Sequence, residues 1–176
     1  NIKADIVTVS HNHFDHSKVN IINGCYKCIT KEGEYDFGDV NIKGIKSSHG
    51  FMRGKNLIYV IKTEGLTICH CGDLGKILTL KQVNEIGHVD VLMLRRGGAT
   101  QVLDCNKAKV VLEQLKPKIA IPMHYKTDAS KVIFALSNRV EPFLKSTNGI
   151  RLGAQELKID SSTIKKYTGV VVFDYE

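Results

Sequence analysis

Three histidines and an aspartate lie within six consecutive positions, in the segment HNHFDH at residues 11–16. The segment follows directly after ADIVTVS, residues 4–10, whose continuous apolar and β-branched run is typical of a strand. Loops at one edge of a sheet converge, and functional sites assemble there. The cluster therefore predicts a site at a strand end, provided that other polar side chains reach the same edge.

Further polar residues stand at the ends of other predicted strands: His49 after a hairpin strand, Asp73 after TICHCG, and His124 after IAIPM. Taken singly, each would be a core or capping residue. Together with the cluster they form a candidate set of seven side chains: His11, His13, Asp15, His16, His49, Asp73 and His124. Imidazole nitrogen and carboxylate oxygen suit Zn²⁺, Mn²⁺ or Fe. Seven ligands are too many for one tetrahedral ion, and they suit two ions that share a carboxylate.

The remaining pattern predicts a mixed α/β fold in one domain spanning residues 1–176. Hairpins come first, at 33–49 and 56–73, and β-α-β alternation follows. Helices are predicted over 17–24, over 79–87 from a capping box and over 104–115, and one or two are predicted within 128–146, with an interruption near Pro142. Strands are predicted over 26–30, 90–94 and 118–123, and two more close the chain at 155–161 and 169–175.

Charge and cysteine content narrow the function classes. The net charge is +7, but the Lys and Arg residues are spread along the chain, which favours a small anionic substrate over nucleic acid. The sequence contains neither a long apolar run nor a secretory signal, and its cysteine count is odd, so we expect a cytoplasmic protein without a membrane span. Cys25 and Cys28 lack a second cysteine pair for a structural zinc site, and we expect small core residues there. The sequence leaves open whether the chain forms a homo-oligomer.

The segment HNHFDH resembles the H-x-H-x-D-H signature of the metallo-β-lactamase superfamily, and the later histidines and aspartate follow in the order of that superfamily. The segments RGKNLIYVI, ICHCGDLG, LTLKQVNEIGHVDVLML and LKPKIAIPMHYKT resemble its small bacterial and archaeal zinc-dependent hydrolases. They are also similar to the ascorbate-phosphate lactonase group and, more distantly, to ribonuclease Z. The resemblance implies an αββα sandwich that lacks the usual N-terminal strands, so we expect the natural protein to have residues upstream of Asn1.

The same resemblance implies a ligand assignment and a reaction. One ion would be held by His11, His13 and His49, and the other by Asp15, His16 and His124, with Asp73 bridging the two. The ions, zinc first and manganese or iron as alternatives, would share a hydroxide that attacks an ester, lactone or phosphoester. Asp15 and Asp73 would be the catalytic carboxylates, with Asp15 orienting the nucleophile. The alternatives are a nuclease or phosphodiesterase, and a non-catalytic, truncated metal-binding module.

Three cationic residues are candidates for substrate contact. Arg95 and Arg96 stand before Gly97-Gly98, where the resembling family tends to have an apolar segment with proline. They could pair with a phosphate or carboxylate of the substrate, or they could be solvated or paired with a neighbouring carboxylate. Lys126 follows the predicted ligand His124 and is the third candidate. His70, three residues before Asp73, is predicted to support the site or pack in the core.

Overall fold

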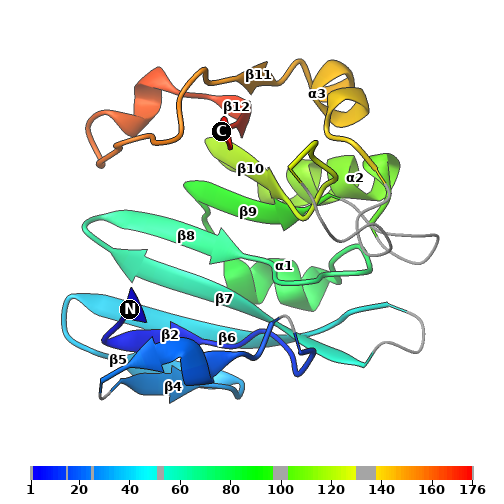
Figure 1. Cartoon of the computed structure of the whole chain (residues 1–176). Helices are drawn as coiled ribbons and strands as arrows, with labels where there is room; N and C mark the ends of the chain where they lie inside the picture. The colour runs from blue at the N-terminus through cyan, green and yellow to red at the C-terminus, as the bar shows by residue number, and fades with distance from the viewer. Residues whose placement is uncertain are drawn as a thin grey trace.

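A computed structural model describes residues 2–14, 16–24, 26–50, 54–96, 103–129 and 138–175. Its centre is an eight-stranded sheet with the strand order β11-β12-β10-β9-β8-β7-β6-β5 (Figure 1). The strands are β5 (Gly33–Asp36), β6 (Val40–Ser48), β7 (Lys55–Thr63), β8 (Leu66–His70), β9 (Val91–Arg95), β10 (Ile119–Met123), β11 (Ile150–Arg151) and β12 (Gly169–Val172). Pairing is antiparallel from β5 to β8 and parallel from β8 to β11. The predicted change from hairpins to β-α-β units is therefore confirmed.

Both predicted hairpins have the turns that their sequences indicate. The β5–β6 turn contains Gly38 with φ of 80°, and its amide donates to the Asp36 carboxylate. The β7–β8 turn contains Glu64 and Gly65, with φ of 49° and 73°. Residues that adopt positive φ let two antiparallel strands reverse over a tight turn. These turns set the register that brings the ends of β6 and β8 to one edge of the sheet.

Helices cover one face of the sheet. They are α1 (Leu80–Ile86), α2 (Cys105–Leu115) and α3 (Glu141–Thr147). The predicted capping box of α1 is present, because the Thr79 hydroxyl accepts from the Gln82 amide and the Gln82 side chain accepts from the Thr79 amide. The Asp104 carboxylate caps α2. Leu92, Val111 and Phe143 lie in the largest apolar cluster, so burial between helices and sheet forms the main core.

Shorter elements cover part of the opposite face. The strands β2 (Ile6–Thr8) and β4 (Lys27–Ile29) pair in parallel, as do β1 (Ile2–Lys3) and β3 (Ile22–Asn23). The hydroxyl of Tyr59 in β7 lies 2.9 Å from the Val9 carbonyl oxygen and 2.8 Å from that of Ile29. This buried tyrosine therefore connects the small β2–β4 sheet to the large sheet. Burial raises the pKa of Tyr59, so the hydroxyl stays protonated as a donor.

Three predicted elements differ from the structure. The segment 17–24 forms only a 3₁₀ turn, η1 (Val19–Ile21), before β3, because the hydroxyl of the expected cap Ser17 donates to the His13 carbonyl instead. The segment 155–161 forms no strand: Leu157 and Ile159 pack on the sheet beside η2 (Ile164–Lys166), which produces the alternating pattern without pairing. An interruption was expected near Pro142, but helix α3 begins at Glu141 with this proline in its first turn; residues 130–137 lie outside the described part.

Two further expectations concern cysteines and membranes. Cys28 is exposed, so its assignment to the core was wrong, and Cys25 lies outside the described residues. In the described part of the chain, every helix is too short or too polar to span a bilayer.

Candidate metal centre

The side chains of the centre come from strand ends at one edge of the large sheet. β8, β9 and β10 are parallel, and β6 runs in the same direction because two antiparallel pairings separate it from β8. His49 follows β6, Asp73 lies beyond β8, and His124 follows β10. Parallel strands end at the same edge, so these residues meet although they are far apart in sequence. The structure thus assembles the edge that the sequence predicted.

Four imidazoles surround one oxygen of the Asp73 carboxylate. The Nε2 atoms of His49, His11, His16 and His124 lie 2.8, 3.7, 3.7 and 3.9 Å from Asp73 Oδ2. The His16 and His124 rings are stacked, with centroids 5.8 Å apart. His124 adopts the left-handed backbone conformation, with φ of 57°, which is strained for a residue other than glycine. Such strain is a feature of functional sites, and here it accompanies the turn that carries the ring to Asp73.

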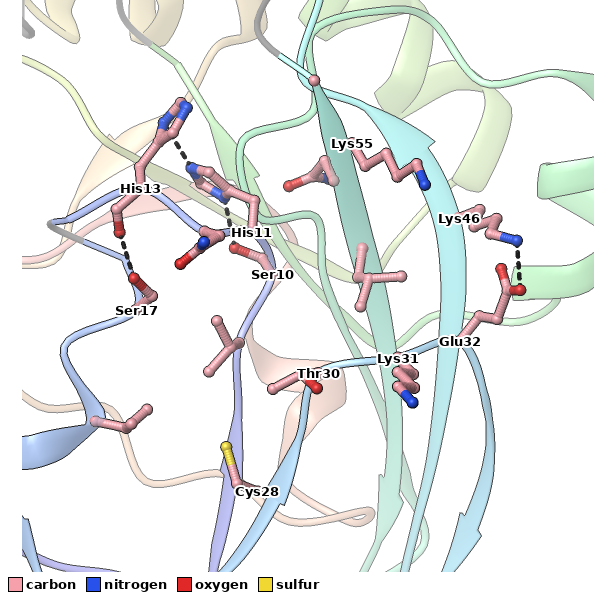
Figure 2. Close-up of a pocket in the computed structure, with 16 residues that line it drawn as sticks. Ser10, His11, His13, Ser17, Cys28, Thr30, Lys31, Glu32, Lys46 and Lys55 are labelled. Carbon is pink, nitrogen blue, oxygen red and sulfur yellow. Dashed lines mark hydrogen bonds and ion pairs between the residues drawn. The ribbon is translucent and has the colours of Figure 1, made fainter.

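The histidines of the HNHFDH segment complete the arrangement. The Ser10 hydroxyl lies 3.0 Å from His11 Nδ1, and His11 Nε2 lies 3.1 Å from His13 Nδ1 (Figure 2). Two groups of possible ligand atoms result, each with all its atoms within 4.8 Å of one another: His11 with His13 and His49, and His11 with His16 and Asp73. The first group has the same members as the trio implied for one ion.

The surroundings of His11, His124 and Asp73 keep these three groups in the protonation states that bind metal. Burial lowers the pKa of His11 to about 4 and also lowers that of His124, on which the positive charge of Arg95 acts in the same direction. For Asp73, burial acts to raise the pKa, but the hydrogen bond from His49 and the charge of Arg95 hold it well below its usual range. A neutral His11, a neutral His124 and an ionised Asp73 suit the binding of a divalent cation.

A polar network positions Asp73. The amide of Asp73 donates to Asn56 Oδ1 over 2.9 Å, and Asn56 Nδ2 donates to the Cys71 carbonyl and the Ser47 hydroxyl. His70 Nδ1 accepts from the Gly72 amide, next to Asp73 in sequence, and its role as a supporting or a core residue stays a prediction. Gly72 has φ of 54°, and a Cβ there would lie 2.5 Å from Asn56 Oδ1. Sequence reasoning missed Asn56; its one signal was a polar residue beginning a buried apolar strand.

The other predicted site residues are placed differently. Asp15 lies outside the described residues. Arg95 is buried, with Nη1 2.6 Å from Asp73 Oδ2, which is the pairing with a neighbouring carboxylate considered above. Arg96 is also buried, but its Nη2 donates to Cys105 Sγ and its guanidinium lies over the Phe143 ring. Lys126 is exposed. The roles of all these residues as ligands or substrate contacts stay predictions.

The metal-free protein is expected to lose stability as the pH falls from about 6.5 to about 4. In that window His11 takes up a proton in the unfolded chain, but in the folded chain only near the lower end. The unfolded state therefore binds more protons, and His11 alone contributes a slope of up to about 1.4 kcal/mol per pH unit. Urea denaturation in the presence of a chelator measures this slope.

Two variants isolate the origin of that slope. His11→Asn should reduce the slope, leaving the part that comes from His124, whereas His88→Asn, which removes an exposed histidine remote from the centre, should leave it unchanged. Equal unfolding free energies of the original protein at pH 7 and pH 5 would contradict the assignment.

Comparison with known proteins identifies the family of the chain. The family model of the beta-lactamase superfamily domain matches residues 1–124. A UPF0173 metal-dependent hydrolase of Carboxydothermus hydrogenoformans is 31% identical over 156 residues, covering 72% of this chain and 69% of that protein. A proposed Zn-dependent hydrolase of the metallo-β-lactamase superfamily from Thermotoga maritima superposes with a TM-score of 0.76 at 36% identity, covering 98% and 83% of the two chains.

A more distant structure shows the fold alone. Igni18, a metallo hydrolase of Ignicoccus hospitalis, superposes with a TM-score of 0.62 at 20% identity, covering 82% of this chain and 71% of that chain. The expected fold class is therefore confirmed, and the named relatives favour a hydrolase over a non-catalytic module. The chain belongs to the metallo-β-lactamase superfamily and is a metal-dependent hydrolase of that superfamily.

Proposed function

We propose that the chain hydrolyses a small anionic ester, lactone or phosphoester at a centre of two divalent ions, most simply zinc, that share Asp73. The observation that carries the proposal is the convergence of four imidazoles on one buried carboxylate oxygen. Among the described residues, the two overlapping ligand groups contain imidazoles and a carboxylate and no thiolate. Such donors favour a catalytic over a closed structural zinc site.

The ions, when bound, supply an activated water and polarise the scissile oxygen. The chain's own residues hold and orient them. Ser10 contacts His11 at Nδ1 and leaves Nε2 directed toward the other ligands. Asn56 fixes the amide of Asp73, so that the carboxylate remains at the centre of the imidazoles. Asp15, next to His16 in sequence, is proposed to orient the attacking water.

A cavity of about 840 Å³ gives the substrate a place beside the histidines. His11 and His13 line one part of it, and Lys31, Lys46 and Lys55 line another (Figure 2). Lys46 is paired with Glu32, which partly neutralises it. The exposed Lys31 and Lys55 favour a negative group on the substrate at that part of the cavity. The volume is within the range of small-molecule sites.

The direct test is hydrolysis of chromogenic substrates by chelated and zinc-reloaded protein. The panel would contain an anionic ester, a neutral ester of the same acyl group, a lactone, a phosphomonoester and a phosphodiester. Zinc-dependent cleavage of an anionic ester, lactone or phosphomonoester is expected. Exclusive cleavage of the phosphodiester would favour the nuclease alternative, and equal rates with and without metal would refute the proposal.

Matched lysine variants test the charge of the substrate. Replacing Lys55 by alanine should raise KM for the anionic ester by about 2- to 5-fold, the range of an exposed ion pair, and leave KM for the neutral ester unchanged. Lys62→Ala is the control, because Lys62 is exposed on the same strand but outside this cavity. Equal effects on both esters would exclude Lys55 as an anion contact.

A further inference from the structure

Arg95 places a permanent positive charge inside the metal centre. It is the last residue of β9, and it is 2% exposed. A guanidinium stays protonated at every physiological pH, so this charge cannot be removed by burial. Buried cations are costly unless they are paired, and Arg95 is paired with the carboxylate proposed to bridge the ions. The charge of Arg95 therefore acts on the ligands of the centre, in addition to the place of this residue in the sheet.

Its contacts reach both candidate ligand groups. Arg95 Nη1 lies 2.6 Å from Asp73 Oδ2, which belongs to the group with His11 and His16. The same nitrogen lies 3.4 Å from Nε2 of His49, which belongs to the group with His11 and His13. A metal ion bound to either atom would thus lie close to the fixed positive charge of Arg95.

The balance between the Asp73 carboxylate and the Arg95 guanidinium determines how strongly the centre attracts a metal ion. Within the two candidate ligand groups, Asp73 is the single carboxylate among the described residues, and the guanidinium already compensates its charge. An incoming divalent ion must take over Asp73 from Arg95 and tolerate the nearby guanidinium. In a buried site, where charges are weakly screened, that repulsion is large. Conversely, the metal-free centre is stabilised, because Asp73 does not remain there as an uncompensated anion.

We propose that Arg95 is an internal competitor of the metal: it stabilises the metal-free protein and weakens metal binding, which keeps the ion exchangeable. This inference rests on the proposed metal centre. It predicts that loss of Arg95 lowers the stability of the metal-free protein but raises its affinity for metal. Loss of a merely structural arginine would not produce this combination. Loss of a structural residue lowers stability and leaves metal affinity unchanged or weaker. Loss of an internal competitor lowers metal-free stability and tightens metal binding.

The test compares the full chain with Arg95→Met, which has similar length and no charge. Thermal unfolding in a chelator and zinc titration by calorimetry are measured on each. The metal-free variant should melt about 5–15 °C lower, since one partner of a buried ion pair is lost. Its zinc dissociation constant should be at least about tenfold lower than that of the original protein. Arg95→Lys, which keeps the charge, should stay close to the original in both measurements.

Arg96→Met is the matched control, because this neighbouring buried arginine contacts Cys105 and Phe143. It should lower the melting temperature without tightening zinc. If Arg95→Met is unfolded without metal, refolding by zinc supports the inference, and failure to fold at saturating zinc overturns it. Unchanged or weaker zinc binding by folded Arg95→Met overturns it while leaving the proposed function in place. An original protein that binds no zinc overturns both.

Discussion

Replacing Asp73 by alanine is expected to abolish hydrolysis and to weaken zinc binding by more than about 100-fold. The carboxylate oxygen is surrounded by four imidazoles, so its loss removes the single acidic donor of the candidate groups among the described residues. Loss of a residue that merely supports a ligand already costs 10–100-fold. Metal analysis after dialysis, with the rate on the best substrate of the panel, measures both effects.

The same replacement should also destabilise the metal-free protein, because the buried Arg95 guanidinium would lose its carboxylate. Asp73→Asn keeps the shape and should likewise lose zinc, which separates the role of charge from that of volume. Asp90→Asn provides the control: Asp90 is a buried carboxylate paired with Lys118 and remote from the candidate ligand groups. It should cost stability and leave zinc bound. Retention of full activity by Asp73→Ala would show that the centre is assigned wrongly.

Replacing Asn56 by alanine is expected to cost about 3 kcal/mol or more of unfolding free energy. The side chain is fully buried, and it bonds to the Asp73 amide, the Cys71 carbonyl and the Ser47 hydroxyl. Each buried polar group left without a partner costs about 1–3 kcal/mol. Because the Asp73 amide is one of these groups, zinc affinity should also fall, by about 10- to 100-fold. Chemical denaturation and zinc titration measure the two effects.

Asn41→Ala is the comparison variant for Asn56. Asn41 lies on the neighbouring strand β6, is exposed, and contacts the Gly38 carbonyl only at 3.5 Å. Its replacement should change stability by less than about 0.5 kcal/mol. If Asn56→Ala were as harmless, the network around Asp73 would not hold the centre.

Hairpins and capped helices were predictable because their signals are local. The turns at Gly38 and Gly65 need positive φ, and the Thr79 capping box satisfies the first amides of α1. The alternation at residues 155–161 led to the wrong prediction of a strand, because an alternating pattern does not show whether the backbone pairs. Leu157 and Ile159 turn toward an apolar cluster, and burial on a sheet face produces the same period of two as strand pairing. Periodicity reports which side chains are buried and not which backbone groups pair.

The sequence by itself determined the donor types of the candidate centre and the strand ends that carry them, because HNHFDH, His49, Asp73 and His124 each follow a segment with the pattern of a strand. Only the tertiary structure decided the charge balance. Arg95 was equally consistent with a substrate contact or a salt bridge, and the fold places its guanidinium on Asp73. Asn56 gained its role in the same way, from a partner 17 residues along the chain. Turns, caps and donor types depend on residues that are adjacent in sequence. Pairing between distant side chains depends instead on the register of strands β7, β8 and β9, and that register exists only in the folded sheet.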